Sequence, residues 1–330
     1  MHRILADSIR RTARIDIAAS LAVLVLVPFL VFGITRPAQA MKITSVKSPG
    51  GIEAWLVSDR SVPLLALRFA FEGGNAQDTP GKEGTANFLS AMLDEGAGDI
   101  TSSVFQERLE EIAMRLSFED GKDTFYGNVE MLTVNRDKSI ELLRLALTRP
   151  RFDTEALERI RKQLQASLIY AARDPDKVAT NEWFKAAFPG HPYGRPANGT
   201  AESIAAIKRE DLENYRKRVF AKSNLKVVAV GDIDEATLAK MLDDVFGELP
   251  DKADLVAVPA FVLPEKGRQI VVEMPVPQSV AVFGAGAMAR KDPDFIPGFV
   301  LNHILGGGGF ASKLMEEVRE KRGMAYSVYS

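Results

Sequence analysis

The chain has 330 residues, no cysteine and a formal net charge of −2. The length allows about two domains, and the absence of cysteine excludes a disulfide framework, a thiolate metal site and a cysteine nucleophile. The near balance of charges gives no sign of a nucleic-acid-binding protein.

The first 40 residues predict export. Four arginines precede a mostly apolar run at 15–34, and the small-x-small sequence Ala38-Gln39-Ala40 follows. This order is typical of a secretory signal peptide, so we expect the mature chain to begin at Met41 in the periplasm. The alternative is an uncleaved segment that anchors the protein in the inner membrane.

Residues 41–250 have the pattern of an α+β domain. Apolar runs rich in aliphatic and aromatic residues predict strands, and apolar residues three or four apart predict helices. In chain order, we expect strands at 52–58 and 62–71, helices at 85–95 and 102–116, a strand at 124–132, helices at 135–148 and 153–173, and a buried strand within 222–234 followed by a helix.

A linker and a shorter second unit are predicted next. Residues 248–266 contain three prolines and no helical period, which indicates an extended interdomain linker over 251–266. In residues 267–330 the expected order is two strands (269–274 and 279–287), a helix, a glycine turn, a helix and a final strand (324–330). This order repeats that of 62–119, so we expect two related domains. The second is too short to close a comparable core and is expected to be truncated.

The residues alone predict no zinc site. Catalytic zinc needs three protein ligands and an open position, and the expected mature chain contains only His191 and His303, in separate predicted domains. Each is expected to be structural or on the surface. The glycines at 306–309 are not followed by the Gly-Lys-Ser/Thr of a phosphate-binding loop, so we interpret them as a turn between helices.

Three segments carry a resemblance to a known family. They are GGNAQDTPGKEGTANFLSAML (73–93), GHPYGRPANGTAESIAAIKREDLENYRKRVFAKSNLKVVAVGDID (190–234) and LNHILGGGGFASKLMEEVREKRGMAYSVYS (301–330). With them the chain resembles the insulinase, or pitrilysin, zinc peptidases, in particular the noncatalytic subunit of the bacterial two-subunit type. The resemblance implies an α+β fold, a tandem repeat of two-layer α/β-sandwich domains like those of pitrilysin and mitochondrial processing peptidase.

The chain departs from this family at its catalytic positions. The family's His-x-x-Glu-His motif would place its two zinc-binding histidines at Asn87 and Ala91 and its general base at Ser90. The third zinc ligand, a glutamate, would fall near Ala166 or Ser167. All four functional groups are missing, so we expect no cofactor in this chain and no catalysis by it alone. Asn87 and Ser90 could instead help to hold a peptide.

The resemblance also implies a role for the second unit. The family's arginine and tyrosine that bind the substrate's carbonyl region match Arg319 and Tyr326. Both side chains donate hydrogen bonds and suit a developing oxyanion. We therefore expect this chain to enclose a peptide substrate and assist a homologous partner that carries His-x-x-Glu-His and the zinc. The alternatives are a purely structural subunit, like the core proteins of larger assemblies, and a truncated remnant without a peptidase role.

Overall fold

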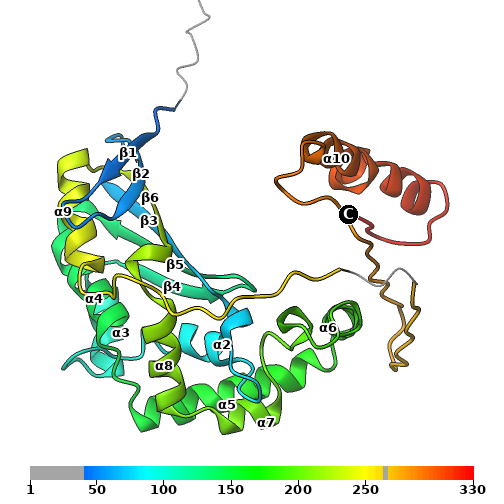
Figure 1. Ribbon diagram of the computed structural model, residues 1–330, viewed down its shortest axis with the longest axis horizontal. Coiled ribbons are helices and arrows are strands. Elements are labelled where there is room, and N and C mark those ends of the chain that lie inside the picture. Colours follow the sequence, from blue (N-terminus) through cyan, green and yellow to red (C-terminus); the bar gives the residue numbers. More distant parts are fainter. Residues whose placement is uncertain (1–40, 263–266) are drawn as a thin grey trace, which may run out of the picture. The chain divides into compact units, whose positions relative to one another are not determined.

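The computed structural model describes residues 41–262 and 267–330 (Figure 1). The predicted signal peptide at 1–40 lies outside the described residues. In the described ranges no helix is both long enough and apolar enough to cross a membrane. The ranges 41–262 and 267–330 are taken one at a time below.

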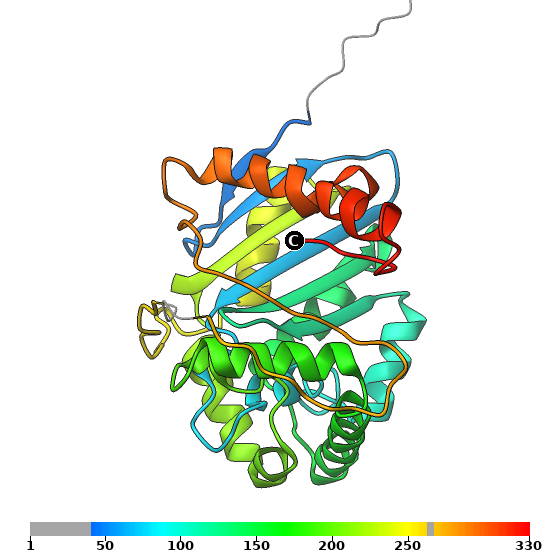
Figure 2. The same cartoon turned by 90° about the vertical axis from the view of Figure 1, so that its right-hand side faces the viewer.

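Residues 41–262 form a six-stranded sheet with helices on one face (Figures 1 and 2). The strand order is β1-β2-β6-β3-β5-β4; β2 and β6 are parallel, and β6, β3, β5 and β4 are antiparallel. The strands are β1 (Thr44–Lys47), β2 (Glu53–Ser58), β3 (Leu64–Glu72), β4 (Arg115–Asp120), β5 (Thr124–Leu132) and β6 (Leu225–Gly231). The helices are α2 (Thr85–Ser90), α3 (Ser102–Glu111), α4 (Arg136–Thr148), α5 (Thr154–Ala171), α6 (Pro175–Ala187), α7 (Ala201–Ala206), α8 (Arg209–Val219) and α9 (Glu235–Phe246).

The two faces of the sheet differ because side chains alternate along a strand. In β3, every second residue from Leu65 to Phe71 is buried under the helices. Phe69 packs edge-to-face on Phe246 of α9 at 5.3 Å between ring centroids, and Phe71 stacks on Phe220 at 4.5 Å. The opposite face is open and carries Trp55, which is 63% exposed, and Val230. This is the two-layer α/β sandwich, and the predicted fold class is confirmed.

Two predicted helices are too long at their C-terminal ends. The helix expected at 85–95 is α2, which ends at Ser90 and is followed by a turn. We expected a helix over 102–116, but α3 ends at Glu111 and β4 begins at Arg115. Ala113 has φ of 51°, a left-handed conformation that no helix continues through. The chain reverses there and enters the sheet as its edge strand.

The predicted linker is extended, and its first part is bound to the first domain. The side chain of Gln77 donates to the carbonyl of Val256 (2.9 Å) and accepts the N–H of Val256 (2.8 Å). The N–H of Asp254 donates to the carbonyl of Arg218 (2.8 Å). Phe261 packs on Phe188 of the loop after α6. Residues 251–262 therefore run as a strap with fixed backbone partners.

Residues 267–330 contain helices but none of the predicted strands. Helix α10 (Phe295–Asn302) leads into a π-helical turn, His303–Gly307, and a second π-helical turn spans Met315–Glu320. The strands predicted at 269–274, 279–287 and 324–330 were wrong: these segments pair with no strand in the described part of the chain. Apolar alternation makes a segment suitable for a sheet, but a strand also needs a neighbour that satisfies its backbone groups.

Candidate functional site

Helix α2, which carries the positions of the missing motif, is anchored at its N-terminus by Asp78. The buried carboxylate of Asp78 accepts the N–H groups of Gly84 (2.8 Å) and Ala86 (3.0 Å). These are donors that the first turn of a helix leaves unpaired. Burial raises the pKa of Asp78 to about 7, although these N–H groups favour the carboxylate. Phe88 lies in the core on the inner side of α2.

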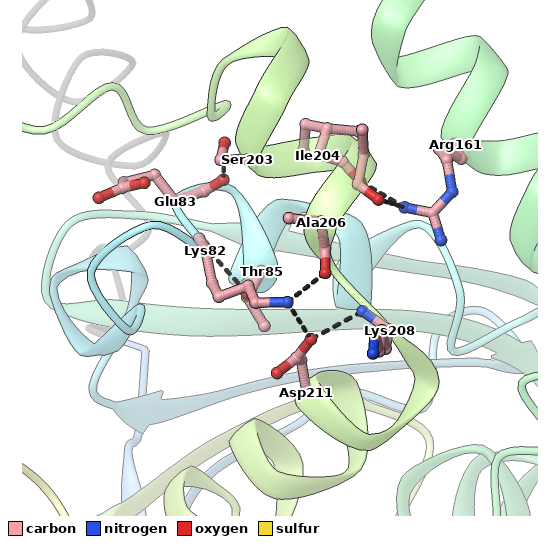
Figure 3. Close-up of polar contacts among 10 residues, drawn as sticks. Lys82, Glu83, Thr85, Arg161, Ser203, Ile204, Ala206, Lys208 and Asp211 are labelled. Carbon is pink, nitrogen blue, oxygen red and sulfur yellow. Dashed lines mark hydrogen bonds and ion pairs between the residues drawn. The ribbon is translucent and has the colours of Figure 1, made fainter.

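The loop before α2 is bound to the C-terminal end of α7 (Figure 3). The ammonium of Lys82 donates to the carbonyl of Ala206 and forms an ion pair with Asp211 at 2.9 Å. The guanidinium of Arg161, from α5, donates to the carbonyl of Ile204. Cations at a helix C-terminus satisfy its unpaired carbonyls and its negative dipole end. Contacts with α5, α7 and α8 therefore hold α2 and the loop before it in place.

The positions of the missing motif now belong to a hydrogen-bonded amide–carboxylate network. Asn87 Nδ2 donates to Oδ1 of Asp120 at 3.1 Å, and Asn75 Nδ2 donates to its Oδ2 at 2.9 Å. The Ser90 hydroxyl donates to the carbonyl of Asn87 in its own helix at 2.8 Å. Ala91, the residue after the last turn of α2, supplies only a methyl group. Burial also raises the pKa of Asp120.

These groups do not fit a zinc ion. Zinc in proteins takes imidazole, thiolate or carboxylate ligands, and the three motif positions offer an amide, a hydroxyl and a methyl group. Asp120 already accepts from two amides. Among residues 41–262 and 267–330, no group of three His, Cys, Asp or Glu side chains is arranged to hold a metal ion.

Of the two histidines in these ranges, His191 has a structural role. Its Nδ1 accepts the N–H of Tyr193 at 3.1 Å, so the ring proton is assigned to Nε2, which then donates to the carbonyl of Pro259 at 2.8 Å. The buried imidazole thus connects the loop after α6 to the strap. His303 lies exposed at the start of a π-helical turn. The expectation that both are structural or on the surface agrees with these positions.

A cationic group near the network was missed by the sequence analysis. Lys122, in the turn between β4 and β5, donates to the carbonyl of Tyr193 at 3.0 Å, and its ammonium lies 4.4 Å from the ring centroid of Phe184. Burial lowers the pKa of Lys122. The Tyr193 hydroxyl donates to Asp123 at 2.7 Å. A Gly-Lys-Asp turn between two strands gave no periodic signal that could have revealed this contact.

In the second unit the structure brings Arg319 and Tyr326 together. The guanidinium carbon of Arg319 lies 4.9 Å from the ring centroid of Tyr326. Between them, Gly323 has φ of 60°, and this left-handed residue reverses the chain after the helix. Tyr326 is 84% exposed. Their role on a substrate stays a prediction.

Two family models match the chain. The model described as insulinase (peptidase family M16) matches residues 56–201, and the model described as peptidase M16 inactive domain matches residues 206–330. A protein of Helicobacter pylori named "non-peptidase homolog YmxG" is 30% identical over 81% of this chain and 62% of its own. An uncharacterized zinc protease of Rickettsia bellii is 22% identical over 82% of this chain and 65% of its own. The chain therefore spans less than two thirds of these curated relatives.

Solved structures show the same fold. The crystal structure of a peptidase M16 inactive domain from Pseudomonas fluorescens has a TM-score of 0.74 and 26% identity, with 88% of this chain and 70% of that chain covered. A Helicobacter pylori protease has a TM-score of 0.73 at 18% identity, covering 88% of this chain and 71% of its own. Pitrilysin itself has a TM-score of 0.59 at 19% identity, over 68% of this chain and 25% of its own.

Proposed function

Because the chain belongs to the M16 (insulinase) peptidase family as an inactive member, we propose that it is the noncatalytic subunit of a zinc-peptidase heterodimer. A homologous partner with His-x-x-Glu-His holds the zinc and hydrolyses the peptide. This chain helps to enclose the peptide and contributes Arg319 and Tyr326 to the partner's site.

The observation that carries the proposal is the network at Asn87. A catalytic centre that had lost one ligand by drift would keep other catalytic groups. Here Asn87 is bonded to Asp120 and Ser90 is bonded back to its own helix. Neither the amide of Asn87 nor the hydroxyl of Ser90 can act as a general base near neutral pH. The carboxylate of Asp120 already accepts hydrogen bonds from two amides. The fold is retained, but the zinc ligands and the general base of the family are replaced. This combination favours a role beside an active partner.

A second observation supports the enclosing role. The open face of the sheet carries exposed apolar side chains in adjacent strands, including Trp55, Val228 and Val230. Neighbouring exposed apolar side chains of this kind are typical of surfaces that bind a partner or a ligand. In the proposed complex, it lines the substrate chamber.

Arg319 and Tyr326 suit the task assigned to them. As the carbonyl of the scissile peptide becomes tetrahedral, negative charge develops on its oxygen. A guanidinium and a phenol aimed at that position stabilise the transition state more than the bound substrate. The loss of one such donor typically lowers kcat by about 10²- to 10³-fold.

The test is an assay of this chain purified in complex with its His-x-x-Glu-His partner, with an internally quenched peptide. Arg319→Ala and Tyr326→Phe are each expected to lower kcat strongly while the complex elutes unchanged from a sizing column. Arg322→Ala, which removes a neighbouring arginine paired with Glu317, is the matched control and should leave turnover intact. Wild-type turnover in both test variants would show that the chain is a structural subunit only.

A further inference from the structure

A third side chain, that of Phe310, lies against Arg319 together with Tyr326. The guanidinium carbon of Arg319 lies 4.8 Å from the ring centroid of Phe310 and 4.9 Å from that of Tyr326. Phe310 comes from the glycine turn after α10, nine residues before Arg319, and Tyr326 comes from the segment that follows Gly323. The cation thus contacts two rings from two separate segments of the chain.

The two rings are not held there by burial. Phe310 is 70% exposed and Tyr326 is 84% exposed. A phenylalanine this exposed gains little from hydrophobic burial, which leaves its contact with the guanidinium as a specific attraction that can hold the ring. Phe310 therefore differs from phenylalanines such as Phe69 and Phe125, which pack in the core of the first domain.

Two of the glutamates near Arg319 are occupied by other cations. Glu316 pairs with Lys313 (2.8 Å) and Lys321 (2.9 Å), and Glu317 pairs with Lys321 (2.7 Å) and Arg322 (2.8 Å). The contacts with Lys313 and Lys321 lower the pKa of Glu316 to about 2. Within the described ranges, no hydrogen bond or ion pair engages the guanidinium of Arg319. Among the residues that the structure describes, it has no carboxylate partner, although its helix is rich in glutamate.

Contact with aromatic rings leaves the hydrogen-bonding capacity of a guanidinium free. Its N–H donors all lie in its plane, whereas an aromatic ring attracts the cation through the ring face. An arginine held by rings can therefore still direct its N–H groups at an oxygen. A salt bridge to Glu316 or Glu317 would use those same donors and turn them away from a substrate.

We propose that Phe310 is a positioning residue, which holds the guanidinium of Arg319 beside Tyr326 so that both donors reach the same substrate oxygen. This inference rests on the proposed function, because it concerns how Arg319 acts in the partner's site. Phe310 itself donates no hydrogen bond and acts only through Arg319.

The experiment uses the complex with the His-x-x-Glu-His partner and compares Phe310→Leu with Phe310→Tyr. Leucine keeps an apolar side chain but has no aromatic face, whereas tyrosine keeps the ring. We expect Phe310→Leu to lower kcat by roughly threefold to thirtyfold, the fold-change that corresponds to losing one cation–π contact. KM and the size of the complex should be unchanged, and Phe310→Tyr should retain wild-type turnover.

A double-mutant cycle separates positioning from packing. In an Arg319→Ala background, Phe310→Leu is expected to cause no further loss, because the residue through which Phe310 acts is already absent. A second readout does not depend on activity. The Arg319 guanidinium lies near the Phe310 ring, so the NMR signal of its Nε–H in the isolated chain should shift in Phe310→Leu. The shift should be much smaller in Phe310→Tyr, which keeps the ring.

The outcomes distinguish this inference from the proposed function. If Arg319→Ala lowers turnover but Phe310→Leu does not, the positioning role is wrong and the proposed function stands. Equal losses from Phe310→Leu with and without Arg319 would assign Phe310 to packing and also overturn the inference. If Arg319→Ala has no effect on turnover, both the proposed function of Arg319 and the role of Phe310 are wrong.

Discussion

Asn87 shows how a catalytic position can be replaced without damage to the fold. The amide accepts and donates hydrogen bonds but neither binds zinc well nor titrates. Its partner Asp120 lies at the end of β4 and also receives Asn75. A buried carboxylate without such partners would be costly. The two amides therefore satisfy both carboxylate oxygens of Asp120.

Metal analysis tests this interpretation directly. The purified chain is expected to contain much less than one zinc per chain and to cleave no peptide, because the two imidazoles, the base and the distant carboxylate are all substituted. Atomic absorption after dialysis against trace zinc is the measurement, and the His-x-x-Glu-His partner serves as the positive control. About one tightly bound zinc per chain with chelator-sensitive hydrolysis would contradict the proposal.

Asp78 is expected to make stability depend on pH. Its pKa is raised from 3.8 to about 7 in the folded chain, so the folded state binds its proton more tightly than the unfolded state. Between about pH 4 and 7 the folded state carries more protons, and the free energy of unfolding contributed by this group falls as pH rises. The slope is at most about 1.4 kcal/mol per pH unit. The raised pKa of nearby Asp120 acts in the same direction.

The measurement is urea denaturation at pH 5, 6, 7 and 8. The variant Asp78→Asn cannot titrate, so its stability should change less over this range than that of the wild type, although it loses one acceptor for the N-terminus of α2. The exposed Asp99→Asn is the control and should follow the wild-type curve. Parallel curves for Asp78→Asn and the wild type would exclude Asp78 as the titrating group.

At the scale of elements, the apolar pattern predicted strands and helices correctly where the rest of the chain provides a partner to pack or pair with. Strand β3 alternates between buried and exposed residues, and α5 has a helical period, so both were placed close to their observed limits. Strand β4 was missed because its residues continue the period of α3, and only the left-handed Ala113 separates them. The segment 279–287 alternates equally well, but no strand pairs with it in the described residues.

The close contact between β3 and β5 gives a prediction at this scale. A Cβ added at Gly127, in the middle of β5, would lie 2.1 Å from the tip of the Phe69 ring. Phe69 is fully surrounded, with Phe118 and Phe246 against it. The ring cannot move aside, so Gly127→Ala should lower the free energy of unfolding by about 1–3 kcal/mol.

Chemical denaturation of the same chain measures this effect. Gly267→Ala is the matched control, because a Cβ there would meet no atom within 4 Å and the backbone is not left-handed. It should leave stability nearly unchanged. Equal stability of Gly127→Ala and the wild type would mean that the Phe69 ring has room that the structure does not show.

At the scale of the whole molecule, the candidate site could be predicted only in part. Resemblance placed Asn87, Ser90 and Ala91 on one helix, because a motif keeps its spacing along the chain. Asp120 and Lys122 come from the end of β4 and the turn after it, and only the sheet brings them toward α2. Phe310 was missed for the same reason. Contacts between distant segments depend on chain reversals, and no periodic pattern encodes them.

Export is the last prediction, and it concerns the chain as a whole. The basic residues, the apolar run and Ala38-Gln39-Ala40 stand in the order that a signal peptidase recognises. We expect the protein in the periplasm with its N-terminus at Met41, which intact-mass spectrometry of the periplasmic fraction measures. The proposed complex also requires that this chain and its partner are in the same compartment.

Ala40→Arg provides the control for this experiment. A large charged residue at the last position of the cleavage site should block cleavage, so the variant should stay with the inner membrane and retain residues 1–40. If the wild type is found in the membrane with an intact N-terminus, the segment is an anchor instead of a signal peptide. A soluble cytoplasmic protein that begins at Met1 would contradict both forms of the prediction, because neither a cleaved nor an anchored chain has that location.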